Sequence, residues 1–228
     1  MFAEVLHSIL IDVQSKSITT EWRVPNTYQE VAWIWRNGNN YIDTWRVPKA
    51  NQWFEVKLWY RISSGGYRYA ILSNYNGLNN NCLSFEVNSW VETWNKARFF
   101  LDSLSWNDYD IFSSNWLTVN SFADIVYTVN NWSSATITVN WTSNSWTIQA
   151  TTFYNVTALL FIDRQLRRST FNHDSAVSYL KIYENWTLKK DFIPCYRKSD
   201  NVIGFWERIW KQFHTNQGSW TLSKGWNV

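Results

Sequence analysis

Glycine is scarce in this 228-residue chain, which has 7 Gly and 3 Pro. No linker rich in either residue divides the sequence, so we expect one large domain. The 3 His and 2 Cys do not show the spacing of a zinc site. No apolar run approaches the roughly 18 residues that a membrane-spanning helix needs. The net charge of +3 is small and spread along the chain, so we expect neither a nucleic-acid partner nor membrane insertion.

Hydrophobic residues make up 45% of the chain and charged residues 17%, a balance typical of a folded domain. We interpret residues 1–27 as a leader or as the remnant of an upstream segment. This stretch lacks the basic start and the small-residue cleavage site of a signal peptide, so none is predicted. Residues 28–228 are expected to form a single domain.

Apolar and polar residues alternate along the domain with a period of two, which is the signature of β-strands. Expected strands cover 54–62, 67–72, 125–129, 134–139, 146–150 and 177–183. Stretches rich in Asn and Ser predict turns at 73–81, 113–116, 130–134 and 142–146. The best helical patterns lie in the first 14 residues and at 163–168. Many short strands without helices between them predict an all-β sandwich or barrel.

The apolar positions of these patterns give a predicted core. It consists of Val31, Ile34, Ile42, Phe54, Val56, Leu58, Ile71, Phe85, Val126, Ile137, Val139, Ile148, Leu159, Phe161, Leu180, Ile182, Phe192 and Ile203.

Tryptophan is as abundant as glycine is rare: there are 18 Trp, and eight of them directly follow Asn or Ser. Asn140-Trp141 and Asn185-Trp186 lie at expected two-residue hairpin turns. Asn-Gly is the usual pair there, because both turn residues need a positive φ. A bulky residue with a positive φ is a conformational outlier.

Two explanations of the tryptophans compete. In the first, they form an aromatic surface on which carbohydrates stack. In the second, many of these positions are glycine in the organism, because some bacterial lineages and their viruses read the codon UGA as glycine. The second explanation accounts together for the surplus of Trp, the deficit of Gly and the turn-like contexts. It does not extend to Trp33 and Trp206, which lie in apolar strand-like sequence.

Two blocks of sequence resemble recurring segments of phage and bacterial surface proteins. The N-terminal block covers 28–45 and ends in Tyr41-Ile42-Asp43-Thr44-Trp45, where those proteins have Tyr-Ile-Asp-Thr-Gly. The C-terminal block includes 181–186, 191–195, 201–206 and 213–216. The chain thus resembles the concanavalin A-like (laminin-G-like, lectin/glucanase-type) family, which implies an antiparallel two-sheet jelly-roll sandwich. Trp45, Trp186 and Trp220 stand at glycines of that family, which favours reassignment.

Catalytic and metal chemistry have little support in the sequence. A retaining glycosidase needs two carboxyl groups about 5–5.5 Å apart, and no strand carries that pattern, so no catalytic residue is predicted. Asp102, Asp108 and Asp110 are candidates for a calcium site, because calcium takes oxygen ligands. No other cofactor is expected. Cys82 and Cys195 are interpreted as two buried thiols, with a disulfide as the alternative.

A sugar-binding face remains as the candidate site, formed by the aromatic and amide residues of 67–81 with an arginine across the same face. Its residues are Tyr67, Tyr69, Asn74, Tyr75, Asn79, Asn80, Asn81 and Arg98. The alternative interpretation is ordinary sheet tyrosines and a polar loop. His214 stands where the family usually has Tyr and is interpreted as a strand residue.

These features predict a non-catalytic binding or adhesion module of a phage virion or a bacterial surface, located extracellularly. It would recognise glycans or another surface partner. One alternative is a structural decoration domain that packs on other virion subunits and binds no sugar. A glycoside hydrolase of the same fold is the third hypothesis.

Overall fold

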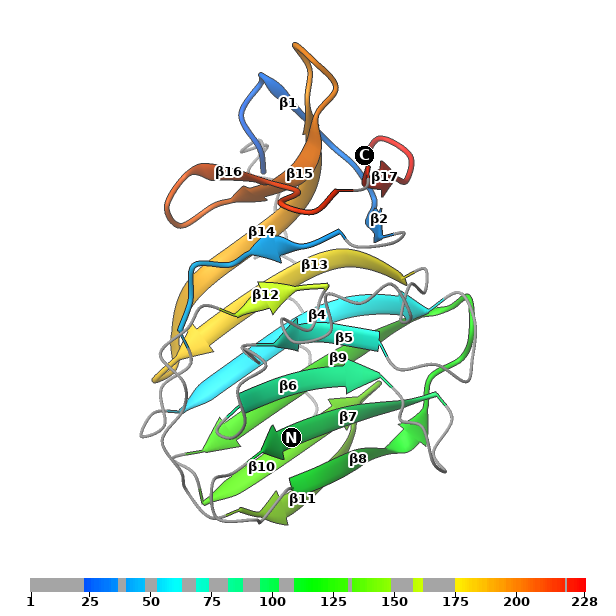
Figure 1. Cartoon of the computed structure of the whole chain (residues 1–228), viewed down its shortest axis with the longest axis vertical. Coiled ribbons are helices and arrows are strands. Elements are labelled where there is room, and N and C mark those ends of the chain that lie inside the picture. Colours follow the sequence, from blue (N-terminus) through cyan, green and yellow to red (C-terminus); the bar gives the residue numbers. More distant parts are fainter. Residues whose placement is uncertain are drawn as a thin grey trace, which may run out of the picture.

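The computed structural model describes residues 23–36, 40–47, 53–62, 69–73, 82–87, 95–102, 109–130, 133–148, 158–161, 175–219 and 221–228. The regular structure in these ranges consists of β-strands in two antiparallel sheets (Figure 1). No helix in the described part of the chain is long and apolar enough to cross a membrane. The helical patterns expected at the start of the chain and at 163–168 lie outside the described residues.

The larger sheet has eleven strands. They are β1 (Tyr28–Glu30), β2 (Ile34–Arg36), β4 (Phe54–Ile62), β9 (Phe122–Asn130), β10 (Ser134–Val139), β11 (Thr142–Thr147), β13 (Ser175–Glu184), β14 (Thr187–Arg197), β15 (Ile203–Glu207), β16 (Gln212–Thr215) and β17 (Ser223–Lys224). The main path runs β11-β10-β9-β4-β13-β14-β15-β16, while β1 pairs with β14 and β2 pairs with β13 and β17.

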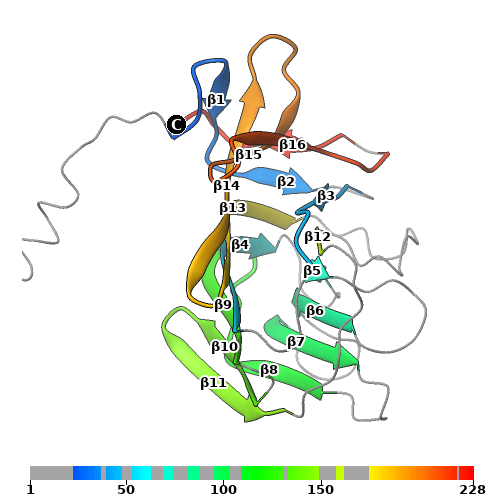
Figure 2. The same cartoon turned by 90° about the vertical axis from the view of Figure 1, so that its left-hand side faces the viewer.

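The smaller sheet has six strands in the order β3-β12-β5-β6-β7-β8. They are β3 (Ile42–Asp43), β12 (Leu159–Leu160), β5 (Tyr69–Ser73), β6 (Cys82–Val87), β7 (Lys96–Asp102) and β8 (Tyr109–Trp116). Figure 2 shows this sheet facing the larger one. At one end β8 contacts β10 and β11, and at the other end β3 contacts β16. The chain is therefore an antiparallel two-sheet sandwich, as the sequence predicted.

The core lies between the two sheets and follows the alternation of the strands. In β4, Phe54, Val56 and Leu58 are buried against the smaller sheet, while the charged residues between them are partly exposed. The other predicted core residues are also buried, except for three. The side chain of Leu159 is not described. Val126 is only partly buried, so that prediction was wrong, whereas Ile203 is partly buried and packs against the core. In β9 the inward positions are instead those of Ile125 and its alternate neighbours, because moving by one residue along a strand reverses the face.

Several strands match their predicted ranges, and two predicted turns are strands. Both β4 and β10 cover the expected residues. However, 113–116 forms the end of β8, and 142–146 lies within β11. The polar β11 is held at the edge of the sheet by its ladder with β10 and by hydroxyl pairs such as Thr136–Ser145 at 2.8 Å. Cross-strand pairing thus outweighs the turn-forming tendency of Ser and Asn here.

Both predicted two-residue hairpin turns are present, and both contain a tryptophan with a positive φ. Between β10 and β11, φ is 46° at Asn140 and 74° at Trp141. Between β13 and β14, φ is 45° at Asn185 and 64° at Trp186. These values are those of a type I′ turn, in which glycine normally follows Asn. Trp45 also has a positive φ, of 53°. Trp220 lies outside the described residues.

Replacing Trp141 with glycine is expected to stabilise the protein by about 1 kcal/mol. A positive φ costs a bulky residue about 1–3 kcal/mol, and glycine removes this cost. The greater freedom of glycine in the unfolded chain opposes the stabilisation by about 0.4–1 kcal/mol. Little packing is lost, because Trp141 is 90% exposed. Thermal unfolding should show a Tm higher by about 2–4 °C.

Trp116→Gly is the matched control for this substitution. Trp116 is also exposed, but it ends β8 without a positive φ, and the ammonium of Lys96 lies 5.4 Å from its ring centroid. Glycine within a strand should lower the stability by about 0.5–1 kcal/mol. An equal gain in both variants would contradict the conformational argument.

The outer face of β14, β15 and β16 carries a second hydrophobic cluster. Val24, Ile193 and Cys195 are buried there, and Trp206 packs beside them on Tyr28, with ring centroids 5.0 Å apart. The Cys195 thiol is free and buried, and burial raises its pKa to about 12. The side chain of Cys82 is not described. Cys195 is therefore a packing residue rather than half of a disulfide.

Candidate functional site

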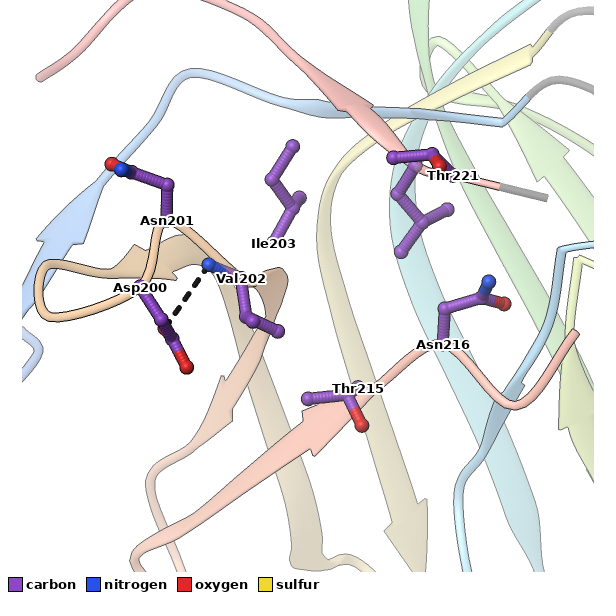
Figure 3. A pocket seen from close by; sticks show the side chains of 8 residues that line it. Asp200, Asn201, Val202, Ile203, Thr215, Asn216 and Thr221 are labelled. Atoms are coloured by element: carbon purple, nitrogen blue, oxygen red, sulfur yellow. Dashed lines mark hydrogen bonds between the residues drawn. The ribbon is translucent and has the colours of Figure 1, made fainter. Parts of the chain in front are cut away.

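A cavity of about 390 Å³ opens where the β14–β15 turn approaches the segment that follows β16 (Figure 3). We call it the rim pocket, after its place at the rim of the sandwich. Its lining consists of Asp200, Asn201, Val202, Ile203, Thr215, Asn216, Thr221 and Leu222. Hydroxyl, amide and carboxylate groups thus surround the cavity together with three aliphatic side chains.

The turn on one side of the rim pocket is ordered by Asp200. Its carboxylate accepts hydrogen bonds from the Arg197 guanidinium, at 2.5 Å from Nη2, and from the backbone N–H of Val202 at 3.2 Å. The bond from Arg197 holds the pKa of Asp200 below its usual range. Asn201, between these residues, has a φ of 58° and an exposed side chain. The turn therefore presents Asn201 to solvent on a fixed backbone.

Two asparagines hold the opposite side of the rim pocket. Oδ1 of Asn216 accepts hydrogen bonds from the backbone N–H groups of Tyr41 at 3.0 Å and Gly218 at 2.9 Å. Its Nδ2 donates to Oδ1 of Asn40 at 3.2 Å, and Asn40 donates in turn to the backbone carbonyl of Thr221 at 3.2 Å. Because Asn40 is fully buried, this chain of bonds anchors the wall of the pocket to the body of the sandwich.

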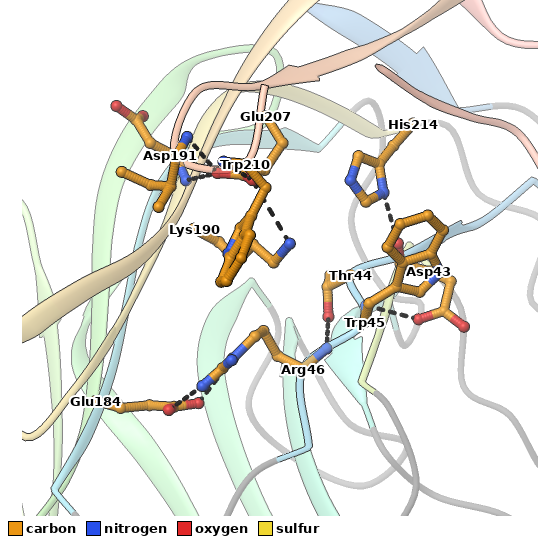
Figure 4. A network of polar contacts seen from close by, with 11 residues as sticks. Asp43, Thr44, Trp45, Arg46, Glu184, Lys190, Asp191, Glu207, Trp210 and His214 are labelled. Atoms are coloured by element: carbon orange, nitrogen blue, oxygen red, sulfur yellow. Dashed lines mark hydrogen bonds and ion pairs between the residues drawn. The ribbon is translucent and has the colours of Figure 1, made fainter. Parts of the chain in front are cut away.

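A buried network of polar side chains, which we call the polar network, lies between β14–β16 and β3 (Figure 4). At its centre is Glu207, which is fully buried. Its carboxylate accepts hydrogen bonds from the backbone N–H groups of Asp191, Ile209 and Trp210 at 3.1, 2.9 and 2.8 Å. Lys190 places its Nζ 3.5 Å from Oε2 of Glu207. Glu207 thus fixes the β15–β16 turn and supplies the counter-charge of Lys190.

The other side of the polar network comes from the segment that contains β3. Arg46 forms a two-pronged ion pair with the buried carboxylate of Glu184, with Nε 2.9 Å from Oε1. Thr44 donates its hydroxyl to the carbonyl of Ala158 at 2.6 Å. The backbone N–H of Trp45 donates to the Asp43 carboxylate at 2.8 Å. The bonds of Arg46 and Thr44 fasten the β3 segment to other parts of the sandwich, whereas the bond between Trp45 and Asp43 lies within the segment.

No known protein family and no curated protein matches this chain. Solved structures do match it. The CBM40 domain of the IT-sialidase from Ruminococcus gnavus, bound to α2,3-sialyllactose, has a TM-score of 0.54 and 13% identity over 68% of this chain and 90% of its own. A putative carbohydrate binding protein from Bacteroides ovatus has a TM-score of 0.56 and 9% identity over 87% of this chain and 62% of its own. Domains LG4-5 of the mouse laminin α1 chain have a TM-score of 0.52 and 13% identity, covering 75% of this chain and 47% of theirs.

The fold is a concanavalin A-like jelly roll. This confirms the fold that the resemblance of the sequence implied.

Within the jelly roll, Arg98 is the one residue of the predicted sugar-binding face whose side chain is described. It lies on β7 and is buried, with Nη1 2.7 Å from Oε2 of the fully buried Glu86. Its guanidinium also lies 4.8 Å from the ring centroid of Phe100. Tyr69 lies in β5 with its side chain undescribed. Tyr67, Asn74, Tyr75, Asn79, Asn80 and Asn81 lie outside the described residues, so this face stays a prediction.

The calcium candidates also stay a prediction. Asp102 ends β7 and Asp110 lies in β8, but their side chains are not described, and Asp108 lies outside the described residues. Elsewhere in the described part of the jelly roll, no three His, Cys, Asp or Glu side chains gather as metal ligands would.

The sequence did not predict the rim pocket or the polar network as sites: Ile203 was predicted as a core residue and His214 as a strand residue, and the other members were given no role in a site. For the polar network the sequence does carry a signal. Lys190 is two positions from the predicted core residue Phe192, and Glu207 is four positions from the predicted core residue Ile203. Lys190 and Glu207 therefore lie on the inward faces of their strands. For the rim pocket there was none, because its two walls come from loops whose approach depends on the whole sheet.

Proposed function

We propose that this jelly roll is a non-catalytic glycan-binding module and that the rim pocket is its binding site. The observation that carries the proposal is the lining of the pocket, in which amide and hydroxyl groups lie beside aliphatic side chains. Such groups hydrogen-bond to sugar hydroxyls, and the aliphatic side chains cover the C–H faces of a sugar ring. The similar CBM40 domain, which is bound to sialyllactose, supports the same function for this fold.

A binding role suits the rim pocket better than catalysis. A glycosidase that retains configuration needs a pair of carboxyl groups about 5–5.5 Å apart. Among the described residues that line the pocket, Asp200 is the one acid, and its carboxylate is engaged by Arg197. The site can therefore hold a sugar, but it does not offer an acid and a nucleophile.

Substitutions in the rim pocket test the proposal. Asn201→Ala and Thr215→Val each remove a hydrogen-bonding group, which should weaken binding of a glycan by about 2- to 12-fold. The glycan is first identified on a glycan array with the wild-type protein, and its Kd is then measured by calorimetry. Thr142→Val, in the exposed start of β11, is the control and should leave the Kd unchanged.

The outcomes separate the remaining hypotheses. If no glycan on the array binds, the proposal fails, and a structural decoration domain that packs on other virion subunits becomes the better explanation. If a glycan binds but neither rim variant weakens its binding, the site lies elsewhere, and the face around Arg98 and 67–81 is the next candidate.

We propose further that the module acts on a phage virion or a bacterial surface, where several copies raise a modest affinity through multivalency. The resemblance of block 28–45 and of the pieces 181–186, 191–195, 201–206 and 213–216 to phage and bacterial surface proteins supports this setting.

We also propose that Trp45, Trp141 and Trp186 stand at positions that the native host translates as glycine. All three have a positive φ, and their side chains are between 52% and 90% exposed. A peptide map of the protein made in its native host, read beside the codons of its gene, tests this. Glycine at these positions is expected. Tryptophan there would overturn reassignment and would favour an aromatic surface for stacking on sugars.

A further inference from the structure

Four aromatic side chains form a continuous row at the outer face of the larger sheet. In order, they are Trp59 of β4, Phe122 of β9, Trp33 before β2 and Trp226 after β17. Neighbouring ring centroids in this row lie 4.7, 5.7 and 4.0 Å apart. We call the row the aromatic ridge. Trp59 is 41% exposed and Trp226 is 67% exposed, and contiguous apolar surface that faces solvent marks interaction sites in proteins.

The tryptophans of the aromatic ridge differ from those at the hairpin turns. None of the three has a positive φ. Trp33 is also matched by Gly225, because a Cβ on this glycine would lie 2.6 Å from two carbon atoms of the Trp33 ring. Any other residue at position 225 would therefore displace the indole. The chain makes room for Trp33, so the aromatic ridge does not depend on how the turn tryptophans are translated.

A hydrogen-bond acceptor lies beside the exposed ring of Trp59. Tyr179, Trp59 and Asp124 are opposite one another on β13, β4 and β9, so their side chains share one face. The Tyr179 hydroxyl donates to Oδ1 of Asp124 at 2.6 Å. Burial, followed by this hydrogen bond, raises the pKa of Tyr179, so the hydroxyl keeps its proton at neutral pH. The other carboxylate oxygen of Asp124, Oδ2, has no hydrogen-bond partner among the described residues.

A donor of positive charge lies beside the next ring of the row. Arg61 is opposite Phe122 in the pairing of β4 with β9. Its Nη2 donates to Oδ1 of Asn120 at 3.1 Å, and its guanidinium lies 5.3 Å from the ring centroid of Trp35. A guanidinium has five N–H donors, so this one bond leaves it further donor capacity. The aromatic ridge is thus flanked by one group of each charge, Arg61 and Asp124.

A sugar ring matches this surface better than a purely apolar partner or a highly charged one. A pyranose has a face of C–H groups, which packs on an aromatic ring, and hydroxyl groups, which both donate and accept hydrogen bonds. A polyanion would be repelled by Asp124 and a polycation by Arg61.

We propose that the aromatic ridge is a second glycan-binding surface, where a neutral oligosaccharide stacks on Trp59 and Trp226 and donates a hydroxyl hydrogen bond to Asp124. The proposal rests on the glycan-binding function proposed above and adds a surface to it. None of the four ridge residues lines the rim pocket, so the two sites can be tested separately.

The experiment titrates the full chain with neutral hexasaccharides of glucose, mannose and galactose, one at a time, by calorimetry. At least one is expected to bind. Trp59→Ala and Trp226→Ala should each weaken this binding at least fivefold, because each removes an exposed ring. Trp116→Ala is the matched control. Trp116 is 58% exposed but lies in β8 of the smaller sheet, so its loss should leave the Kd unchanged.

NMR locates the same binding in the unsubstituted chain. The indole N–H resonances of Trp59 and Trp226 should shift in a saturable way, with the Kd that calorimetry gives, while that of Trp116 stays in place. If Trp59→Ala does not fold, Trp226→Ala and these resonances still decide.

The results separate this proposal from the rim pocket. Binding that the rim variants weaken and the ridge variants do not would overturn the ridge as a glycan site and leave the proposed function intact. Binding that only the ridge variants weaken would support the ridge and overturn the assignment of the rim pocket.

Two further outcomes count against the aromatic ridge. If none of the neutral hexasaccharides binds, the ridge proposal is overturned, whereas the glycan array, with its charged members, still tests the proposed function. A dimer that sedimentation detects in the unsubstituted chain and that Trp226→Ala dissociates would show that a second copy covers the ridge, and this too would overturn the proposal.

Discussion

Replacing Glu207 with alanine is expected to destabilise the protein by about 3–5 kcal/mol. Its buried carboxylate accepts hydrogen bonds from three backbone N–H groups at 2.8–3.1 Å. Alanine leaves these donors without their acceptor. It also leaves the ammonium of Lys190 buried without its counter-charge. Thermal unfolding should show a Tm lower by about 10 °C.

A double-mutant cycle separates the two contributions of Glu207. Glu207→Gln keeps an acceptor oxygen for the turn but removes the charge, and Lys190→Met removes the ammonium while keeping most of its aliphatic stem. If the pair is coupled, the double variant should be more stable than the sum of the single effects predicts, by about 0.5–3 kcal/mol. Denaturant unfolding of the four proteins gives the four free energies. Additive effects would show that Lys190 does not depend on Glu207.

The strands that could be predicted from sequence are those in which a single physical signal dominates. In β4, apolar and charged residues alternate over nine positions, and the burial pattern follows them. In β9, residues 125 and 126 are both β-branched and apolar, so the sequence does not say which one faces the core. The strand β11 consists largely of Ser, Thr and Asn, and its pairing with β10 is visible only in three dimensions.

The positive φ of a bulky tryptophan at each of the two hairpin turns could also be predicted, because it depends only on the local sequence. Asn140-Trp141 and Asn185-Trp186 lie between strands that leave no room for a longer turn, so the positive φ follows from the chain path alone. The candidate sites could not be predicted in this way. Arg46 meets Glu184 across 138 positions of sequence, and Asn40 meets Asn216 across 176. Such pairs form only because the strand order brings the β3 segment beside β13, β14 and β16.

Arg98→Met is expected to destabilise the protein by about 3–5 kcal/mol, although sequence analysis placed Arg98 on the ligand-binding face. Glu86 is fully buried, and the guanidinium of Arg98 lies 2.7 Å from its carboxylate. Methionine keeps much of the aliphatic stem, but it removes the guanidinium that lies over Phe100 and leaves the buried carboxylate without this counter-charge. Denaturant unfolding should therefore show a large loss of stability in the absence of any glycan.

The companion variant Glu86→Gln/Arg98→Met tests whether this loss comes from the charge of the buried Glu86 carboxylate or from the lost packing of the guanidinium. With both charges removed, much of the stability should return, because the double variant no longer buries a carboxylate that has lost the counter-charge of Arg98. Glycan binding, measured at a temperature where each variant is folded, should stay near the wild-type value. A variant that keeps its stability and loses glycan binding would instead identify Arg98 as a ligand-binding residue. That result would place the binding site on the face of the smaller sheet and not in the rim pocket.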